Sequence, residues 1–296
     1  MIRVDLPFAP PLDPSNLFGH LVATGVPGVE EWRDGRYRAV ARLASGPVII
    51  EVGLPVGSAV QARLHLADAA DEPEAVALVR RALDLDLDAP AMVATLSEDP
   101  VLAPLVAAAP GRRRPGTLDP ESMVLRAVLG QQVSTAAART HAARLVAAFG
   151  TPIEDPAGDL TRAFPSAGVL AADPQAVAAT LRLPESRKRT FAAVVAALAT
   201  GAVDLGAPAE EVRAALLALP GVGPWTADTV LMRALGAADV LLPTDLGVVR
   251  AARRLGLPDR PRGLEEHARR WSPYRTHAVQ YLWATGVHPV NTLPPG

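Results

Sequence analysis

Alternation of hydrophobic and polar residues in the first third of the chain predicts a small sheet. Residues 30–43 have the pattern of a β-hairpin with Asp34-Gly35 at its turn, a pair that favours two-residue hairpin turns. Two further strands and two amphipathic helices are predicted from the same kinds of pattern, over 48–52, 59–66, 12–25 and 72–83. We therefore expect an antiparallel sheet that is backed by helices.

From residue 89 onward, the strand pattern gives way to the three- and four-residue spacing of helices. The predicted helical segments are short and span 121–130, 134–149, 174–181, 187–200, 208–219, 225–235, 245–255, 262–271 and 275–285. Residues 110–120 are polar and bounded by proline, and they predict a solvated loop. The chain is thus predicted to be an α+β protein, with an N-terminal α/β domain over 1–88 and a larger all-helical region over 89–296.

Composition excludes several kinds of chemistry. The 296 residues are 49% hydrophobic and 20% charged, which is typical of a globular protein. The chain has no cysteine, so disulfides, thiolate zinc sites, iron–sulfur clusters and cysteine nucleophiles are excluded. Its six histidines form no His-x-x-x-His pair and no carboxylate cluster indicates a catalytic metal, so we expect no cofactor. No apolar run approaches the roughly 20 residues of a membrane span and residues 1–10 lack a signal-peptide core, so we expect a cytoplasmic protein without a membrane partner.

Charge is divided unevenly along the chain. Residues 1–110 contain 8 Arg and Lys against 15 Asp and Glu, whereas residues 111–296 contain 21 against 16. The N-terminal part is therefore acidic, with a net charge of −7, and the C-terminal part is mildly basic, at +5. A polyanionic partner is expected to bind the C-terminal part, with the acidic domain facing away from it.

The most informative stretch is Leu-Pro-Gly-Val-Gly-Pro-Trp at 219–225, between two predicted helices. Its glycines leave the turn without side chains, and the next helix points its positive end at the same place. This favours a site for one phosphate, bound by the main-chain amides of Gly221, Gly223 and Thr226. An ordinary helix connection, with a glycine cap and a proline start, explains the same spacing.

Asp245 begins a predicted helix directly after Leu-Pro-Thr at 242–244. At such a position an aspartate normally caps the helix. However, the glycine turn resembles the helix-hairpin-helix motif, a sequence-independent DNA-backbone clamp. Together, the turn and the later Pro-Thr-Asp resemble the helix-hairpin-helix-Gly/Pro-Asp superfamily of DNA glycosylases. The resemblance implies that Asp245 is catalytic, because a carboxylate stabilises the positive charge that develops on the sugar when an N-glycosidic bond breaks.

Three further segments narrow this resemblance: Leu-Gly-Gln-Gln-Val-Ser at 129–134, Trp-Ser-Pro-Tyr-Arg at 271–275 and Gln-Tyr-Leu-Trp-Ala-Thr-Gly at 280–286. They are similar to bacterial alkylbase glycosylases of the 3-methyladenine DNA glycosylase II type. The resemblance implies a monomer with a cleft between two helical subdomains, which excises alkylated purines from double-stranded DNA. The alternatives are an oxidised-base glycosylase of the same superfamily, a non-catalytic helix-hairpin-helix DNA-binding protein, and a helical protein unrelated to DNA.

The same resemblance assigns the pocket that receives the base. Trp225 and Trp283 match positions that line it, where electron-rich rings stack on a cationic base. Thr229 and, in a looser alignment, His20 stand where the family has aromatic residues. Gln132 occupies the position of the residue that wedges into the duplex, a leucine in the best-known pattern, although it also fits a plain polar helix junction.

Three further expectations concern cations, lysine and DNA contacts. By position, the main-chain carbonyls of Leu217, Leu219 and Val222 would hold a structural Na⁺ or K⁺, as family hairpins do. Strand-cutting members of the superfamily carry a lysine just after the glycine turn, where this chain has Trp225, and Lys188 is its only lysine. A monofunctional enzyme without lyase activity is therefore expected. Candidate DNA contacts, each also explained as a solvated surface run, are Arg112–Arg114, Arg187–Arg189, Arg250, Arg253 and Arg254.

Overall fold

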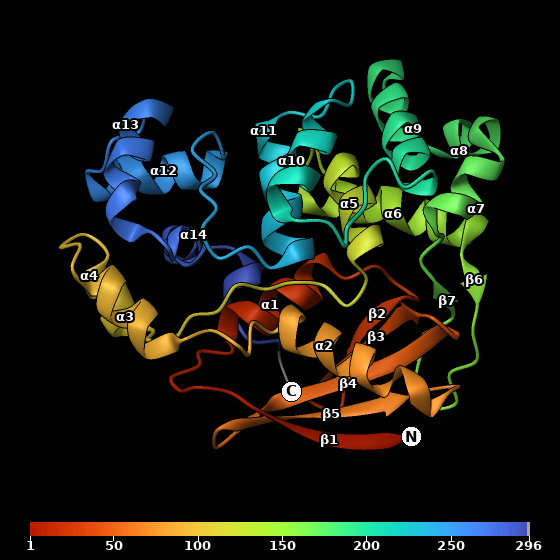
Figure 1. The fold of residues 1–296 in the computed structure, drawn as a ribbon, viewed down its shortest axis with the longest axis horizontal. Coiled ribbons are helices and arrows are strands. Elements are labelled where there is room, and N and C mark those ends of the chain that lie inside the picture. Colours follow the sequence, from red (N-terminus) through yellow and green to blue (C-terminus); the bar gives the residue numbers. More distant parts are fainter. Residues whose placement is uncertain (295–296) are drawn as a thin grey trace.

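The computed structural model describes residues 1–294. Its N-terminal part is a five-stranded antiparallel sheet in the order β1-β5-β4-β3-β2, at the bottom of Figure 1. The strands are β1 (Ile2–Pro7), β2 (Glu30–Arg33), β3 (Arg36–Leu43), β4 (Gly46–Val56) and β5 (Ala59–His65). One face of the sheet shares a hydrophobic core with helices α1 (Ser15–Thr24) and α2 (Glu72–Ala82). The predicted sheet backed by helices is confirmed.

The predicted hairpin is formed by β2 and β3. Asp34 and Gly35 at its turn both have positive φ, of 50° and 69°, as a two-residue turn between right-twisted strands requires. The edge strand β1, which pairs Ile2 with Leu64, was not predicted. A signal for it exists in the alternation of Ile2, Val4 and Leu6, although the segment is short.

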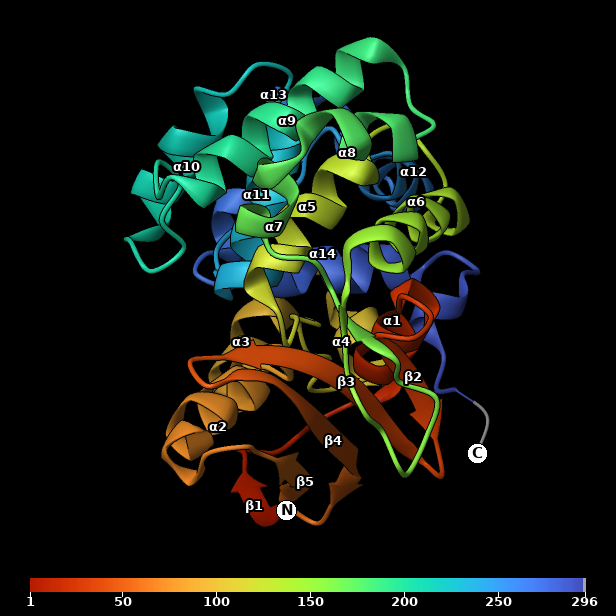
Figure 2. The same cartoon turned by 90° about the vertical axis from the view of Figure 1, so that its right-hand side faces the viewer.

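Helices dominate the rest of the chain, as predicted, and they form the two lobes that Figure 1 shows side by side. Figure 2 shows these helices above the sheet. The first lobe contains α5 (Pro120–Leu129), α6 (Thr135–Phe149), α7 (Ala167–Ala172), α8 (Pro174–Thr180), α9 (Glu185–Ala199), α10 (Ala209–Leu217) and α11 (Pro224–Val230), which a π-helical turn extends over Leu231–Leu235. The second contains α3 (Ala89–Ser97), α4 (Ala103–Ala108), α12 (Leu246–Leu255), α13 (Pro261–His267) and α14 (Arg275–Ala284). Short 3-10 turns lie at Ala69–Asp71, Ala268–Trp271 and Pro289–Asn291.

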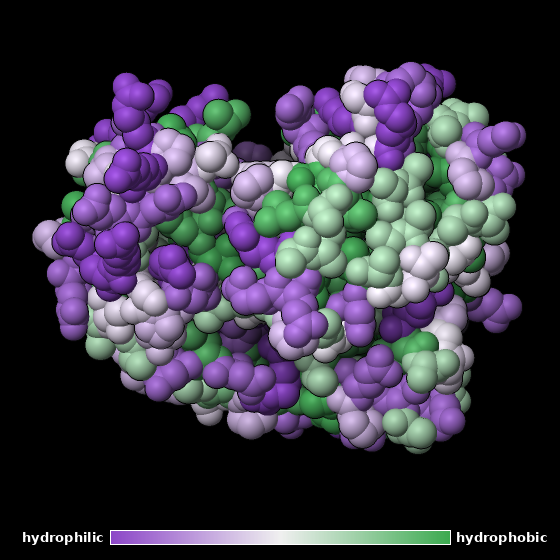
Figure 3. Space-filling view, turned by 45° about the horizontal axis from the view of Figure 1, so that its top comes forward, coloured by the Kyte–Doolittle hydropathy of each residue, from purple (hydrophilic) through white to green (hydrophobic). Residues whose placement is uncertain are grey.

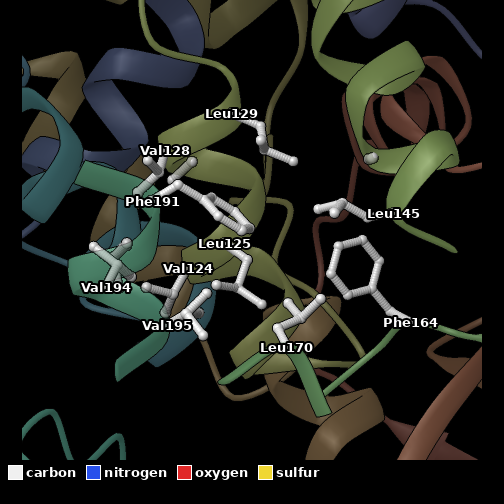
Figure 4. Close-up of a cluster of buried hydrophobic side chains, with 14 of the residues drawn as sticks. Val124, Leu125, Val128, Leu129, Leu145, Phe164, Leu170, Phe191, Val194 and Val195 are labelled. Atoms are coloured by element: carbon white, nitrogen blue, oxygen red, sulfur yellow. The ribbon is translucent and has the colours of Figure 1, made fainter. Parts of the chain in front are cut away.

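Each lobe has its own hydrophobic core. In the first lobe, Leu125 of α5, Leu145 of α6 and Phe191 of α9 lie in one buried cluster (Figure 4). In the second, Trp271 is fully buried and donates a hydrogen bond to Asp99 at 2.7 Å. Because the cores are separate, the surface between the lobes is left free to form a site.

Two features correct the sequence analysis. The all-helical region contains two paired strands of two residues each, β6 (Thr151–Pro152) and β7 (Arg162–Ala163). Helices α3, α4 and α7 were not among the predicted segments, although α3 supplies Met92 and Leu96, and α4 supplies Val106, to the second core. Among the described residues, no helix is both long and apolar enough to cross a bilayer.

The segment Arg112–Arg114 is buried, which contradicts its prediction as a solvated loop and a DNA contact. Its three side chains are 7%, 0% and 2% exposed. Arg113 donates hydrogen bonds to the main-chain carbonyls of Ala9, Pro11, Asp84 and Leu87. Arg114 pairs with Asp84 at 3.1 Å and also donates to the carbonyl of Met232. These arginines join the sheet domain to the helical lobes and cannot reach a partner.

Candidate active site

Asp245 is held in one orientation by four hydrogen bonds. It caps α12, because its Oδ1 accepts from the amides of Gly247 and Val248 at 2.9 and 3.0 Å. The indole N–H of Trp283 also donates to Oδ1, at 2.8 Å, and that of Trp225 donates to Oδ2, at 3.0 Å. The carboxylate that caps the helix is therefore the same one that the resemblance assigns to catalysis. Since every one of these donors is neutral, the negative charge is positioned without being cancelled by an ion pair.

A cavity of about 660 Å³ lies at this carboxylate and is lined by both lobes and by α1. The five residues predicted for catalysis and base binding all line it: His20, Trp225, Thr229, Asp245 and Trp283. Figure 3 shows that the surface is hollowed between the lobe of α12–α13 and the lobe of α10–α11. The structure thus brings together residues that lie more than 260 positions apart in the chain.

The glycine turn between α10 and α11 has the expected shape. Gly221 has a φ of 78°, and a Cβ there would lie 2.0 Å from Oγ1 of Thr190, so glycine is required twice over. The turn is exposed at Gly221, and within residues 1–294 the amides of Gly221 and Gly223 donate to no protein acceptor. They are therefore free to bind an anion.

The structure contradicts the prediction that the main-chain amide of Thr226 binds a phosphate. Its amide donates to the carbonyl of Gly223 at 3.0 Å and its side chain is buried, so it cannot bind a phosphate. Its hydroxyl instead accepts from Nε2 of Gln131, which also donates to the carbonyl of Gly221. Sequence reasoning missed Gln131, which ties the loop after α5 to the glycine turn.

Gln132 projects from this tied loop. It is exposed, and its φ of 55° lies in the left-handed region that a residue with a side chain seldom occupies. Such strain persists only where neighbouring contacts maintain it, and the two hydrogen bonds of Gln131 do so here. An exposed side chain on a fixed backbone is what a wedge into a duplex needs.

Arg233 is a cavity residue that the sequence analysis missed. It follows two apolar residues in the π-helical turn, is 4% exposed and donates to the carbonyl of Pro115 at 2.7 Å. Its guanidinium carbon lies 5.2 Å from the ring centroid of Trp283, in a cation–π contact. Burial, and secondarily Arg114, lower its pKa to about 9, while Asp245 acts in the opposite direction. It therefore stays charged at neutral pH.

The chain is similar to known proteins in sequence and in fold. The family described as AlkA N-terminal domain matches residues 3–119. DNA-3-methyladenine glycosylase 2 of Escherichia coli is 32% identical over 95% of this chain and 96% of its own length. The chain belongs to the AlkA family of DNA-3-methyladenine glycosylases.

Two further similarities complete the placement in the AlkA family. The chain is 48% identical, over 99% of its length, to a probable bifunctional transcriptional activator/DNA repair enzyme AlkA of Mycobacterium tuberculosis, but it spans only 59% of that relative. The solved structure of a 3-methyladenine DNA-glycosylase from Archaeoglobus fulgidus matches 96% of the chain, with a TM-score of 0.81 at 21% identity. The second likeness shows a shared fold.

The lysine and the remaining arginines considered in the sequence analysis lie outside the cavity or at its rim. Lys188 pairs with Glu185 at 2.9 Å, at the start of α9. Arg253 pairs with Asp259, whereas Arg250 and Arg254 are exposed and line the cavity. Of the predicted arginines, these two are therefore placed best to meet a phosphate next to a bound nucleotide.

The carbonyls predicted to hold Na⁺ or K⁺ surround the glycine turn. Leu219 accepts from the amide of Val222 at 3.2 Å, and within the described chain the carbonyls of Leu217 and Val222 accept no such bond. Main-chain oxygens are suitable ligands for a hard monovalent cation. The donor set fits the ion, and its binding stays a prediction.

Replacing Gly221 with alanine is expected to weaken DNA binding. Alanine is strained at this φ, and its Cβ would overlap Thr190, so the turn must open and its free amides move apart. We expect the Kd for an undamaged duplex, measured by fluorescence anisotropy, to rise about tenfold, the loss of one charge-assisted contact.

Gly168→Ala is the matched control, because Gly168 is exposed on α7, away from the turn. An added Cβ there would make only an ordinary contact, 3.9 Å from Oγ of Ser166, so thermal unfolding and DNA affinity should stay close to those of the wild type. A Gly221→Ala variant that folds and binds duplex as tightly as the wild type would remove the phosphate site.

Proposed function

We propose that this protein is a monofunctional DNA glycosylase that extrudes alkylated purines from duplex DNA and hydrolyses their N-glycosidic bond. The observation that carries the proposal is Asp245, fixed by two indole N–H groups at the wall of a cavity of nucleotide size. Membership of the AlkA family supports the assignment. Base excision of this kind starts the repair of damaged DNA.

The chemistry follows from the charge and position of this carboxylate. As the bond between C1′ and the base nitrogen breaks, its electrons leave with the base, and the sugar gains oxocarbenium character. A carboxylate that is already oriented stabilises this charge without reorganisation. Water then adds to C1′ and loses a proton, which the carboxylate can accept. Base release needs little acid catalysis where alkylation has made the purine a cationic leaving group.

Extrusion of the nucleotide is assigned to the glycine turn and the neighbouring loop. The free amides of Gly221 and Gly223 would hold one phosphate, and the positive end of α11 reinforces them. Gln132 would fill the space that the base leaves, since the cost of unstacking is a few kcal/mol. Gln131 joins the loop that carries Gln132 to the glycine turn by two hydrogen bonds. The phosphate-binding amides and the wedge residue are therefore held at a fixed position relative to each other.

The test of this function is single-turnover release of bases from a methylated duplex. Release of methylated purines above the rate of the protein-free duplex is expected, with no release from a matched duplex that contains 8-oxoguanine. Binding without release would instead support a non-catalytic DNA-binding protein. Preferential release of 8-oxoguanine would favour the oxidised-base alternative.

Lyase activity is expected to be absent. A Schiff base needs an amine at C1′, and the position after the glycine turn is Trp225, whose N–H is bonded to Asp245. Lys188 forms an ion pair with Glu185, and both of these residues lie outside the cavity. Borohydride should therefore trap no more covalent protein–DNA adduct from the wild type than from Lys188→Arg, and an adduct in high yield from the wild type would contradict the proposal.

A further inference from the structure

The charge of the cavity does not suit a cationic base. Asp245 is the single carboxylate in the described lining, which contains five arginines: Arg126, Arg139, Arg233, Arg250 and Arg254. Of these, only Arg126 has a carboxylate partner within the described chain, Glu30 at 3.0 Å. Arg233 is the one that is buried, at 4% exposed, so a cationic purine that lost its hydration beside it would be repelled by its charge.

Arg233 also competes directly for an aromatic surface. Its guanidinium lies against the ring of Trp283, so the protein's own cation already occupies a π-face that would attract a cationic base. Trp225 and Trp283 both direct their N–H edges at Asp245, which fixes the orientation of the two rings. The aromatic attraction for a cationic base is thereby reduced where the base must bind.

Two polar groups in the lining lack partners among residues 1–294. The hydroxyl oxygen of Thr229 is buried and makes no hydrogen bond, although a helical threonine normally bonds to the preceding turn. The ring of His20 on α1 makes no hydrogen bond within the described chain, and it is half-buried. An unsatisfied polar group destabilises a buried site unless a ligand pairs with it.

His20 is held in its neutral form. Burial lowers its pKa well below the ordinary value, and the charges of Arg233, Arg126 and His288, which face it from three other segments, lower it further. A neutral imidazole offers one donor and one acceptor, whereas an aromatic hydrocarbon ring at this place would offer only a stacking surface. The polar edge of a neutral purine is the complementary partner.

We propose, on the basis of the function proposed above, that this cavity favours neutral damaged purines over cationic alkylated ones. His20 and Thr229 determine this specificity by hydrogen bonding to the polar edge of the extruded base. The ligand class is a purine with an uncharged ring and free acceptors on its edge, such as a deaminated or exocyclic-adduct purine. Cationic methylpurines remain substrates, released with a smaller rate enhancement.

The experiment compares single-turnover release of hypoxanthine, which is neutral, and 7-methylguanine, which is cationic, from otherwise identical duplexes. Each rate is divided by that of the protein-free duplex. In the wild type, the enhancement is expected to be larger for hypoxanthine. In His20→Phe, the ratio of hypoxanthine to 7-methylguanine release should fall about tenfold, because one hydrogen bond is lost and a ring that attracts a cation is gained.

Thr229→Val keeps the shape of the side chain and should lower the same ratio about threefold to tenfold. Thr180→Val is its control, because the hydroxyl of Thr180 is bonded to Ala176 on α8 and lies outside the cavity. If His20→Phe does not fold, as judged by thermal unfolding, Thr229→Val decides the question alone. Equal ratios in the wild type and the folded variants would overturn this inference but not the glycosylase assignment, which fails only if the wild type releases neither base.

Discussion

Asp245→Asn is expected to lower base release by about 10³-fold while leaving the affinity for duplex DNA nearly unchanged. Asparagine has the same shape and can still cap α12, so the helix should persist. What is lost is the negative charge that stabilises the sugar cation, together with an acceptor for one indole N–H. Single-turnover release from a methylated duplex measures the first effect, and fluorescence anisotropy measures the second.

Asp259→Asn is the control for this variant. Asp259 is an exposed carboxylate of the same lobe, paired with Arg253 and outside the cavity, so its release rate should stay within about twofold of the wild type. Asp245→Asn that retains a tenth or more of the wild-type rate would show that this carboxylate does not stabilise the transition state.

Arg114→Met is expected to lower the free energy of unfolding by about 3–5 kcal/mol, because it breaks a buried ion pair from one side. Asp84 would lose its cationic partner, and the carbonyls of Met232 and Arg81 would lose a donor. Urea unfolding measures the loss. Arg33→Met, which removes an exposed pair with Asp159, should change stability by at most about 1 kcal/mol.

The pH dependence of stability tests the same pair. Burial alone would raise the pKa of Asp84, but the charge of Arg114 and the hydrogen bond from His277 outweigh it and lower the pKa to about 2. The folded pKa is below the unfolded value near 4, so the stability from this carboxylate is complete above about pH 4 and is lost as the pH falls toward 2. In Arg114→Met the loss should begin at a higher pH. An unfolding free energy within 1 kcal/mol of the wild type, with an unchanged acid limb, would contradict the role of this pair.

Local rules explain which parts of the fold were predictable. The turn at Asp34-Gly35, the glycine at 221 and the cap at Asp245 each depend on the backbone of a few consecutive residues. Helix and strand spacing likewise reports which side of an element faces a core. The site residues came from the resemblance to a glycosylase family, and the cavity at Asp245 contains all five of the residues assigned to catalysis and base binding.

Burial of charge was decided only by the tertiary structure. Arg113, Arg114 and Arg233 are polar residues that the sequence predicts to be solvated or leaves unassigned, but the fold surrounds them with main-chain carbonyls of distant segments, so they are buried. Arg112 is buried beside Asp13, with which it pairs at 3.1 Å. The unpartnered hydroxyl of Thr229 and the bonds of Gln131 depend on the same long-range packing. The sequence by itself determined most of the elements, the hairpin and glycine turns and the acidic residue at the helix start, because these depend on neighbours along the chain. The tertiary structure alone decided the charge and the free hydrogen-bonding groups of the cavity, because they depend on which segments meet in space.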